Sequence, residues 1–121
     1  FTGYACVNCR QMESNVWSDK EIKRILKDDV VLVSLHVDAT KKLPKEERYE
    51  TTMAGRTKKV ITEGDKWMVF QANTYGTNSQ PYYVFLDNKE NPVIENANYQ
   101  DYGTVSLFKN WLKRGLETYQ N

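Results

Sequence analysis

Residues 1–13 of the chain read FTGYACVNCRQME, and they hold both of its cysteines, Cys6 and Cys9. Two residues separate the cysteines, and an acidic residue, Glu13, follows four positions after the second one. Cysteines at this spacing occur in metal sites, in short structural disulfides and in redox pairs. Because the chain has no other cysteine, whatever chemistry these two perform they perform together.

The length and charge of the chain limit the classes of protein to which it can belong. Its 121 residues suffice for one domain with one hydrophobic core. The formal net charge is only +1, which argues against nucleic acid or an anionic membrane surface as the main partner. No apolar run is long enough to cross a bilayer, and no signal peptide is recognisable. Because the sequence opens on Phe1 instead of methionine, we expect it to be a piece of a longer protein.

The residues after the cysteine pair predict two helices followed by a strand. A helix is expected from Cys6 onward, with Met12 and Val16 one turn apart on its apolar face. The stretch SDKE at 18–21 has the form of a capping box, and it predicts a second helix that buries Ile22, Ile25 and Leu26. Residues 30–37, VVLVSLHV, are apolar on both faces, which is typical of a central strand that is covered on both sides.

Residues 39–65 interrupt this pattern. They are rich in Lys, Glu and Thr, and we expect them to form a surface insertion. Within it, 51–53 is expected to pair with 58–61 as a hairpin across Ala54 and Gly55. A helix is then predicted over 65–76, ending at Gly76 and burying Trp67, Val69 and Phe70.

The last third of the chain predicts two strands and a final helix. The strands are expected at 82–87 and 92–96, joined by the turn NKEN. The helix after them has a single apolar face, formed by Val105, Phe108, Leu112, Leu116 and Tyr119. We interpret Trp67, Trp111 and the pair Tyr82–Tyr83 as core residues and His36 as a satisfied strand residue.

Two of the three interpretations of the cysteine pair have little support. A zinc site needs about four ligands, and His36 is the only histidine that could join the cysteines. A purely structural disulfide would close a loop of four residues, which stabilises a fold by only about 2 kcal/mol. The redox interpretation is therefore preferred, although a structural bridge stays an alternative.

A redox role explains both the position and the spacing of the cysteines. If the helix begins at Cys6, the unpaired amides and the positive end of the helix dipole lower the pKa of that thiol, so Cys6 is the expected attacking group. Cys9 lies about one turn further into the helix, where it can resolve a mixed disulfide, and it should be less exposed. Glu13 is four residues beyond Cys9, so its charge could raise the Cys9 pKa and its carboxylate could accept the thiol proton.

Pro81, in NSQPYYVFLD just ahead of a predicted strand, adds a second feature. A Cys-x-x-Cys at the head of a helix, followed by such a proline and a strand–strand–helix tail, resembles the thioredoxin fold, in which this proline is cis. FTGYACVNCRQMESNVW is similar to the active-site region of one branch, the C-terminal periplasmic domain of DsbD-type thiol:disulfide interchange proteins, the cytochrome c biogenesis family. The similarity continues through NSQPYYVFLD to FKNWLKRGLE and covers most of the chain apart from the insertion.

The resemblance implies an α/β fold with a central mixed sheet flanked by helices, and a redox enzyme. Such a domain takes electrons from a transmembrane donor and reduces disulfides of partner proteins in the periplasm or another extracytoplasmic space, tethered to the inner membrane by upstream sequence. Cys6 would be the nucleophile, Cys9 the resolving thiol and Glu13 a tuner of the pair. The resemblance implies no metal and no organic cofactor, and it places the substrate-binding surface at Tyr4, Val7, Asn8, Gln80 and Pro81.

The chain departs from this family in three places. The strand that leads into the cysteines would lie between 30–37 and 82–87, but only Phe1 and Thr2 of it are present, so we expect an apolar strand upstream. Ala5 stands where the family often has Trp, and the insertion is long. Two other functions therefore stay open: a free-standing disulfide oxidase or isomerase, and a thioredoxin-fold binding module whose disulfide is structural.

Overall fold

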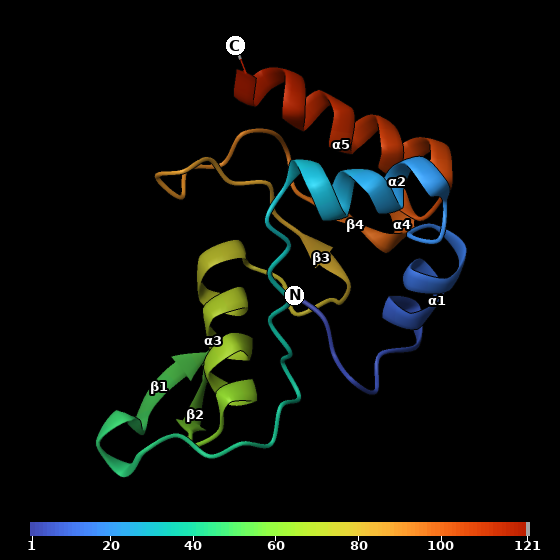
Figure 1. The fold of residues 1–121 in the computed structure, drawn as a ribbon. Helices are drawn as coiled ribbons and strands as arrows, with labels where there is room; N and C mark the ends of the chain where they lie inside the picture. The colour runs from blue at the N-terminus through green and yellow to red at the C-terminus, as the bar shows by residue number, and fades with distance from the viewer. Residues whose placement is uncertain (121) are drawn as a thin grey trace. The chain divides into compact units, whose positions relative to one another are not determined.

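A computed structural model describes residues 1–120 of the chain, which form two compact units. The hairpin unit consists of residues 1–6 and 34–80, and the helical unit consists of residues 7–33 and 81–120. Figure 1 shows the elements of each unit by label and colour.

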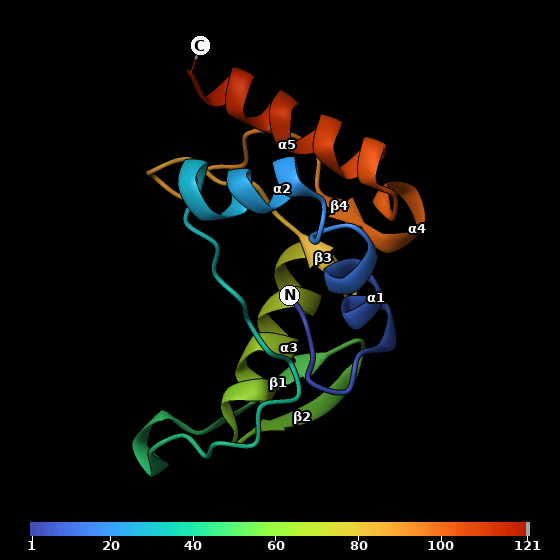
Figure 2. The ribbon, with the colours of Figure 1, turned by 45° about the vertical axis from the view of Figure 1, so that its right-hand side comes forward.

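The hairpin unit is built from one antiparallel hairpin and one helix. Strand β1 (Tyr49–Met53) pairs with β2 (Arg56–Val60), and Met53 lies opposite Arg56. The two linking residues, Ala54 and Gly55, both have positive φ, as the tight turn of a two-residue hairpin requires. The predicted hairpin is therefore confirmed, with strands longer than expected, and it lies alongside helix α3 (Glu63–Tyr75) in both Figure 1 and Figure 2.

Helix α3 has clear signals at both ends. Thr62 and Asp65 form a reciprocal capping box at its start, which was not predicted. Gly76 ends the helix in the left-handed conformation, and this stop was predicted from the sequence. Val69 is buried and packs with Leu43 and Val60. The prediction that Phe70 is buried was wrong, because its side chain is 43% exposed and contacts other aromatic rings at the surface of the unit.

The strand predicted over 30–37 is largely absent. Residues 30–35 are irregular, and Val31 is 91% exposed, so the expectation of burial on both faces was wrong. Regular pairing is confined to a single parallel bridge between Thr2 and His36, where Thr2 donates to the Leu35 carbonyl and accepts from the Val37 amide. A strand needs a partner along its length, and only Thr2 supplies one among residues 1–120.

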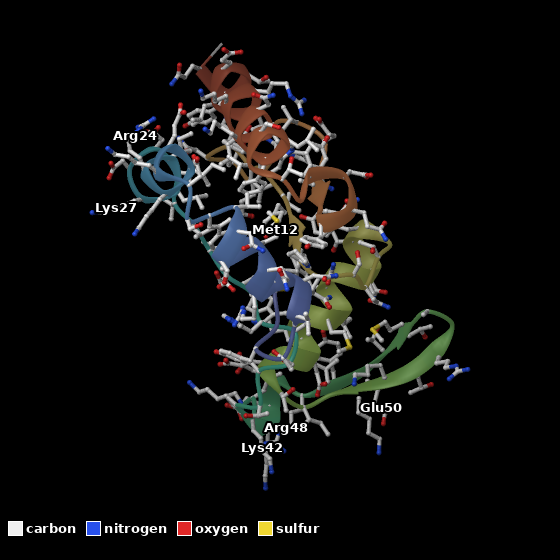
Figure 3. The ribbon with its side chains drawn as sticks, turned by 90° about the vertical axis from the view of Figure 1, so that its right-hand side faces the viewer. Met12, Arg24, Lys27, Lys42, Arg48 and Glu50 are labelled. Carbon is white, nitrogen blue, oxygen red and sulfur yellow. The ribbon has the colours of Figure 1, made fainter. Side chains whose placement is uncertain are left out.

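The helical unit holds the larger core. Its helices are α1 (Val7–Asn15), α2 (Lys20–Arg24) continuing into a π-helix (Ile25–Asp29), α4 (Tyr99–Tyr102) and α5 (Val105–Gln120). Figure 2 shows α2 running beside α5. In Figure 3, Met12 on α1 marks the core, whereas Arg24 and Lys27 extend outward from the second helical segment. The fully buried side chains of this core are Met12, Val16, Ile22, Ile25, Ala97, Phe108, Trp111 and Leu112.

The start of α2 differs from the prediction in its capping residue. Asp19, and not Ser18, is the N-cap, and its carboxylate accepts from the amides of Glu21 and Ile22. Ser18 instead donates its hydroxyl to the Ser14 carbonyl. The Glu21 side chain does not reach back to the cap, because it forms ion pairs with Lys109 and Lys113 of α5.

The C-terminal hairpin and helix follow the sequence with smaller differences. Strands β3 (Tyr82–Tyr83) and β4 (Ala97–Asn98) are short, and a bridge between Leu86 and Pro92 extends their pairing toward the turn. The bounds predicted for the second strand, 92–96, were wrong, because β4 begins at Ala97 and only Pro92 of that range is bridged. On the predicted inward face of α5, Phe108 and Leu112 are buried, and Val105 and Leu116 are partly buried against the same core. Tyr119 is 45% exposed, so its assignment to this face was wrong. The described strands form two separate two-stranded sheets, and no helix within residues 1–120 has the length and apolar character to cross a membrane.

Candidate functional site

The two cysteines stand at the start of helix α1. The helix begins at Val7, so Cys6 immediately precedes its first turn and Cys9 lies within it. Both cysteines are disulfide-bonded, and since the sequence has no others they bond to each other. Cys6 is half-buried, whereas Cys9 is only 2% exposed. The expected difference in exposure between the two cysteines is thus confirmed, with Cys6 the more exposed of the two.

The residues ahead of Cys6 are held by a carboxylate that the sequence did not single out. Asp38 Oδ1 accepts from the Tyr4 amide at 2.8 Å, and Asp38 Oδ2 accepts from the Ala5 amide at 3.0 Å. Partial burial raises the pKa of Asp38, but these amides, with a smaller contribution from His36, lower it below its ordinary value. Asp38 is therefore ionised at neutral pH. Its only sequence signal was an acid directly after the apolar run 30–37.

Three residues predicted to bind substrate flank the cysteines in the sequence, and all three are exposed. Tyr4 is 63% exposed, and its ring stacks on the imidazole of His36 with centroids 4.0 Å apart. Val7 is 71% exposed and Asn8 is exposed as well. An exposed aromatic ring and an exposed apolar side chain next to a cysteine pair suit contact with a polypeptide, although their role in binding stays a prediction.

Glu13 lies on α1 but is already engaged. Its carboxylate forms an ion pair with Arg10 Nε at 2.6 Å, and both side chains are largely exposed. Burial raises the pKa of Tyr83, and the Glu13 charge raises it further, so the hydroxyl of Tyr83 stays protonated. The proposed effect of Glu13 on Cys9 stays a prediction, and it would have to compete with the pairing to Arg10.

A buried glutamine fixes the loop that carries Gln80. Gln71 on α3 is fully buried, donates its side-chain amide to the Ser79 carbonyl at 2.8 Å, and accepts from the Gln80 side chain at 2.7 Å. Pro81 is buried and directly precedes β3. The sequence did not identify Gln71, whose only signal was a polar residue inside an otherwise apolar helical stretch. Gln71 is the side chain that holds residues 79–80 in place.

A surface pocket lies elsewhere in the hairpin unit. It has a volume of about 620 Å³ and is lined by residues of 41–48 and 63–67, none of which is a predicted site residue. Figure 3 labels two of its cationic residues, Lys42 and Arg48. Within residues 1–120, no cluster of three His, Cys, Asp or Glu side chains is arranged to hold a metal ion.

Comparison with known proteins gives one match. Residues 1–102 match the family model described as the thioredoxin-like domain, which covers most of the chain. No curated protein matched the chain. The match and the mixture of helices with small antiparallel sheets confirm the fold class expected from the sequence. A Cys-x-x-Cys pair on this fold indicates thiol–disulfide redox chemistry in general.

Proposed function

The chain belongs to the family of thioredoxin-like domains, and from that premise we propose that it is a protein-disulfide reductase that acts on extracytoplasmic partner proteins. The observation that carries the proposal is the asymmetry of the cysteine pair: Cys6 is partly exposed ahead of a helix, and Cys9 is buried within it. A structural bridge needs no accessible sulfur. An exchange reaction needs one accessible sulfur and benefits from a second one that is shielded.

The proposed reaction begins with the reduced pair. The Cys6 thiolate attacks one sulfur of the partner disulfide, forms a mixed disulfide and releases the other partner sulfur as a thiolate. The Cys9 thiol then loses its proton and attacks the Cys6 sulfur, which frees the second partner sulfur. Two electrons pass to the partner, and the domain is left with the Cys6–Cys9 disulfide in which it is described here.

Each chain element has a distinct part in this scheme. The positive end of the α1 dipole would stabilise negative charge on Cys6, which directly precedes the helix, and so favour the attacking thiolate. The exposed side chains of Tyr4, Val7 and Asn8 would contact the partner around the disulfide. Gln80 and Pro81 would present backbone to an extended partner segment, with Gln71 holding that loop in shape.

The source of electrons and the location follow from the sequence resemblance. A DsbD-type domain receives electrons from a transmembrane donor, so the oxidised pair described here would be reduced again by that donor outside the cytoplasm. Glu13 would assist the attack of Cys9 on the mixed disulfide by accepting the Cys9 proton. A Glu13→Gln variant should then release the partner from the mixed disulfide more slowly.

The reduction potential of the Cys6–Cys9 couple tests the proposal. The domain is equilibrated with glutathione mixtures, and the free thiols are quantified by alkylation. A reductase should have a potential on the order of −230 to −270 mV, whereas a value near −120 mV would make the domain an oxidant. A pair that never exchanges with glutathione would instead be a structural bridge. A Cys9→Ser variant should trap the mixed disulfide, and Cys6→Ser, its matched control, should trap none.

A further inference from the structure

The carboxylate of Asp38 closes the turn that delivers the chain to Cys6. One oxygen accepts from the Tyr4 amide and the other from the Ala5 amide, so both residues between Gly3 and Cys6 are fixed by one side chain. The Cys6 amide in turn donates to the Gly3 carbonyl at 3.4 Å. The turn is therefore held from inside by its own backbone and from outside by Asp38.

Asp38 is itself rigidly placed. It follows Val37, which is buried and whose amide donates to the Thr2 carbonyl at 2.9 Å. The residue that accepts from Val37, Thr2, comes two positions before Tyr4, the first residue that Asp38 binds. The segment before Cys6 and the segment around Asp38 are thus joined at two successive points, first through the backbone and then through a side chain.

The carboxylate also lies close to the reactive cysteine. Asp38 Oδ2 is 3.3 Å, and Cys6 Cβ is 3.4 Å, from the point where a side chain on Gly3 would begin. The carboxylate and the Cys6 side chain thus both border the same small space beside Gly3. A negative charge close to Cys6 disfavours a thiolate there, although the two amides that bind the carboxylate reduce its field.

We propose that Asp38 is a positioning residue for Cys6 and that it keeps the potential of the Cys6–Cys9 couple low. The inference rests on the proposed redox function and deepens it. Two effects act in the same direction. A fixed turn holds Cys6 where it meets Cys9, which favours the disulfide, and the nearby charge destabilises the Cys6 thiolate, which disfavours the reduced pair.

The sharpest test is Asp38→Asn, which keeps the shape of the side chain. Asparagine has one acceptor oxygen where aspartate has two, so one of the Tyr4 and Ala5 amides would face an NH₂ group and lose its partner. The matched control is Asp87→Asn. Asp87 also accepts from two amides, those of Lys89 and Asn91, but it does so in the turn between 86 and 92.

The readout is the equilibrium with glutathione, measured for both variants and the parent protein. Asp38→Asn should lower the equilibrium constant for forming the disulfide by three- to tenfold, a rise in potential of about 15–30 mV. Asp87→Asn should leave the constant unchanged, even if its thermal unfolding shifts. A purely structural role for Asp38 would lower the melting temperature and leave the constant as it is in the parent.

The outcomes separate the inference from the function on which it rests. A parent pair that never exchanges would overturn the proposed function. A parent that exchanges, with an Asp38→Asn constant within twofold of it, would overturn the inference alone. If the variant does not fold, amide hydrogen exchange is measured on the parent protein. The amides of Tyr4 and Ala5 should be protected, although both residues are exposed, because Asp38 binds them. Exchange of these amides at the rate of free amides would refute the role of Asp38.

Discussion

Replacement of Gly64 by alanine should destabilise the hairpin unit, although alanine favours helices. A Cβ at this position would lie 2.6 Å from both the amide nitrogen and the carbonyl oxygen of Ala39, and 2.7 Å from the Val37 carbonyl oxygen. These are backbone atoms, so no side-chain rotation relieves the overlap. Overpacking of this kind costs about 1–3 kcal/mol, and the gain in helix propensity returns at most about 1 kcal/mol. We expect a net loss of about 1–2 kcal/mol.

Urea denaturation followed by circular dichroism measures this loss. The midpoint should fall while the slope stays the same, which marks a change in stability and not in the denatured state. Thr74→Ala, at an exposed position of the same helix, is the control and should stay within about 0.5 kcal/mol of the parent. A Gly64→Ala variant as stable as the parent would refute the reasoning. Because the displaced segment carries Asp38, the same variant should also raise the potential of the Cys6–Cys9 couple.

Three further perturbations test the fold around the site. Phe108→Ala empties a fully buried position and should cost about 3–5 kcal/mol in thermal unfolding, and a loss below about 1 kcal/mol would contradict the assigned core. Gln71→Ala leaves the Ser79 carbonyl and the Gln80 side chain without their partner, so we expect a loss of about 1–3 kcal/mol and faster proteolysis at 77–80; an unchanged cleavage rate would speak against the clamp. Burial raises the pKa of Asp65, but two backbone amides lower it below its ordinary value of 3.8. The stability that ionised Asp65 contributes is therefore present above that value and is lost as the pH falls through the lower pKa of the folded state. In urea midpoints measured against pH, Asp65→Asn should reduce this loss at acid pH, and an unchanged loss would exclude Asp65 as its source.

The parts of the fold that local sequence controls were predicted well. The stop at Gly76 follows from glycine in the left-handed conformation, and burial of Ile22 and Ile25 follows from helical spacing. The strand at 30–37 could not be predicted in the same way. Apolar, β-branched residues favour extended backbone, but a strand forms only where a second segment supplies hydrogen bonds, and here pairing reaches only His36.

In the candidate site, too, the features set by local sequence could be predicted and those set by distant contacts could not. The different exposure of Cys6 and Cys9 follows from a spacing of one helical turn, so the sequence was sufficient. Asp38 lies 34 residues from the amide of Tyr4 that it binds, and nothing in a single sequence indicates such a distant contact. Gln71 was missed because helical spacing predicts which positions are buried but not which buried polar group holds a loop.

The exposed strip at Val31, Leu32 and Val33 has a practical consequence for every measurement described above. An exposed run of apolar side chains favours association between molecules, and the chain's small net charge provides little electrostatic repulsion to oppose it. We expect turbidity and sedimentation to depend on protein concentration, and a Val31→Lys variant to remove that dependence. Redox titrations should therefore be run at low micromolar protein concentration, so that alkylation measures exchange between the monomer and glutathione and not exchange within associated molecules.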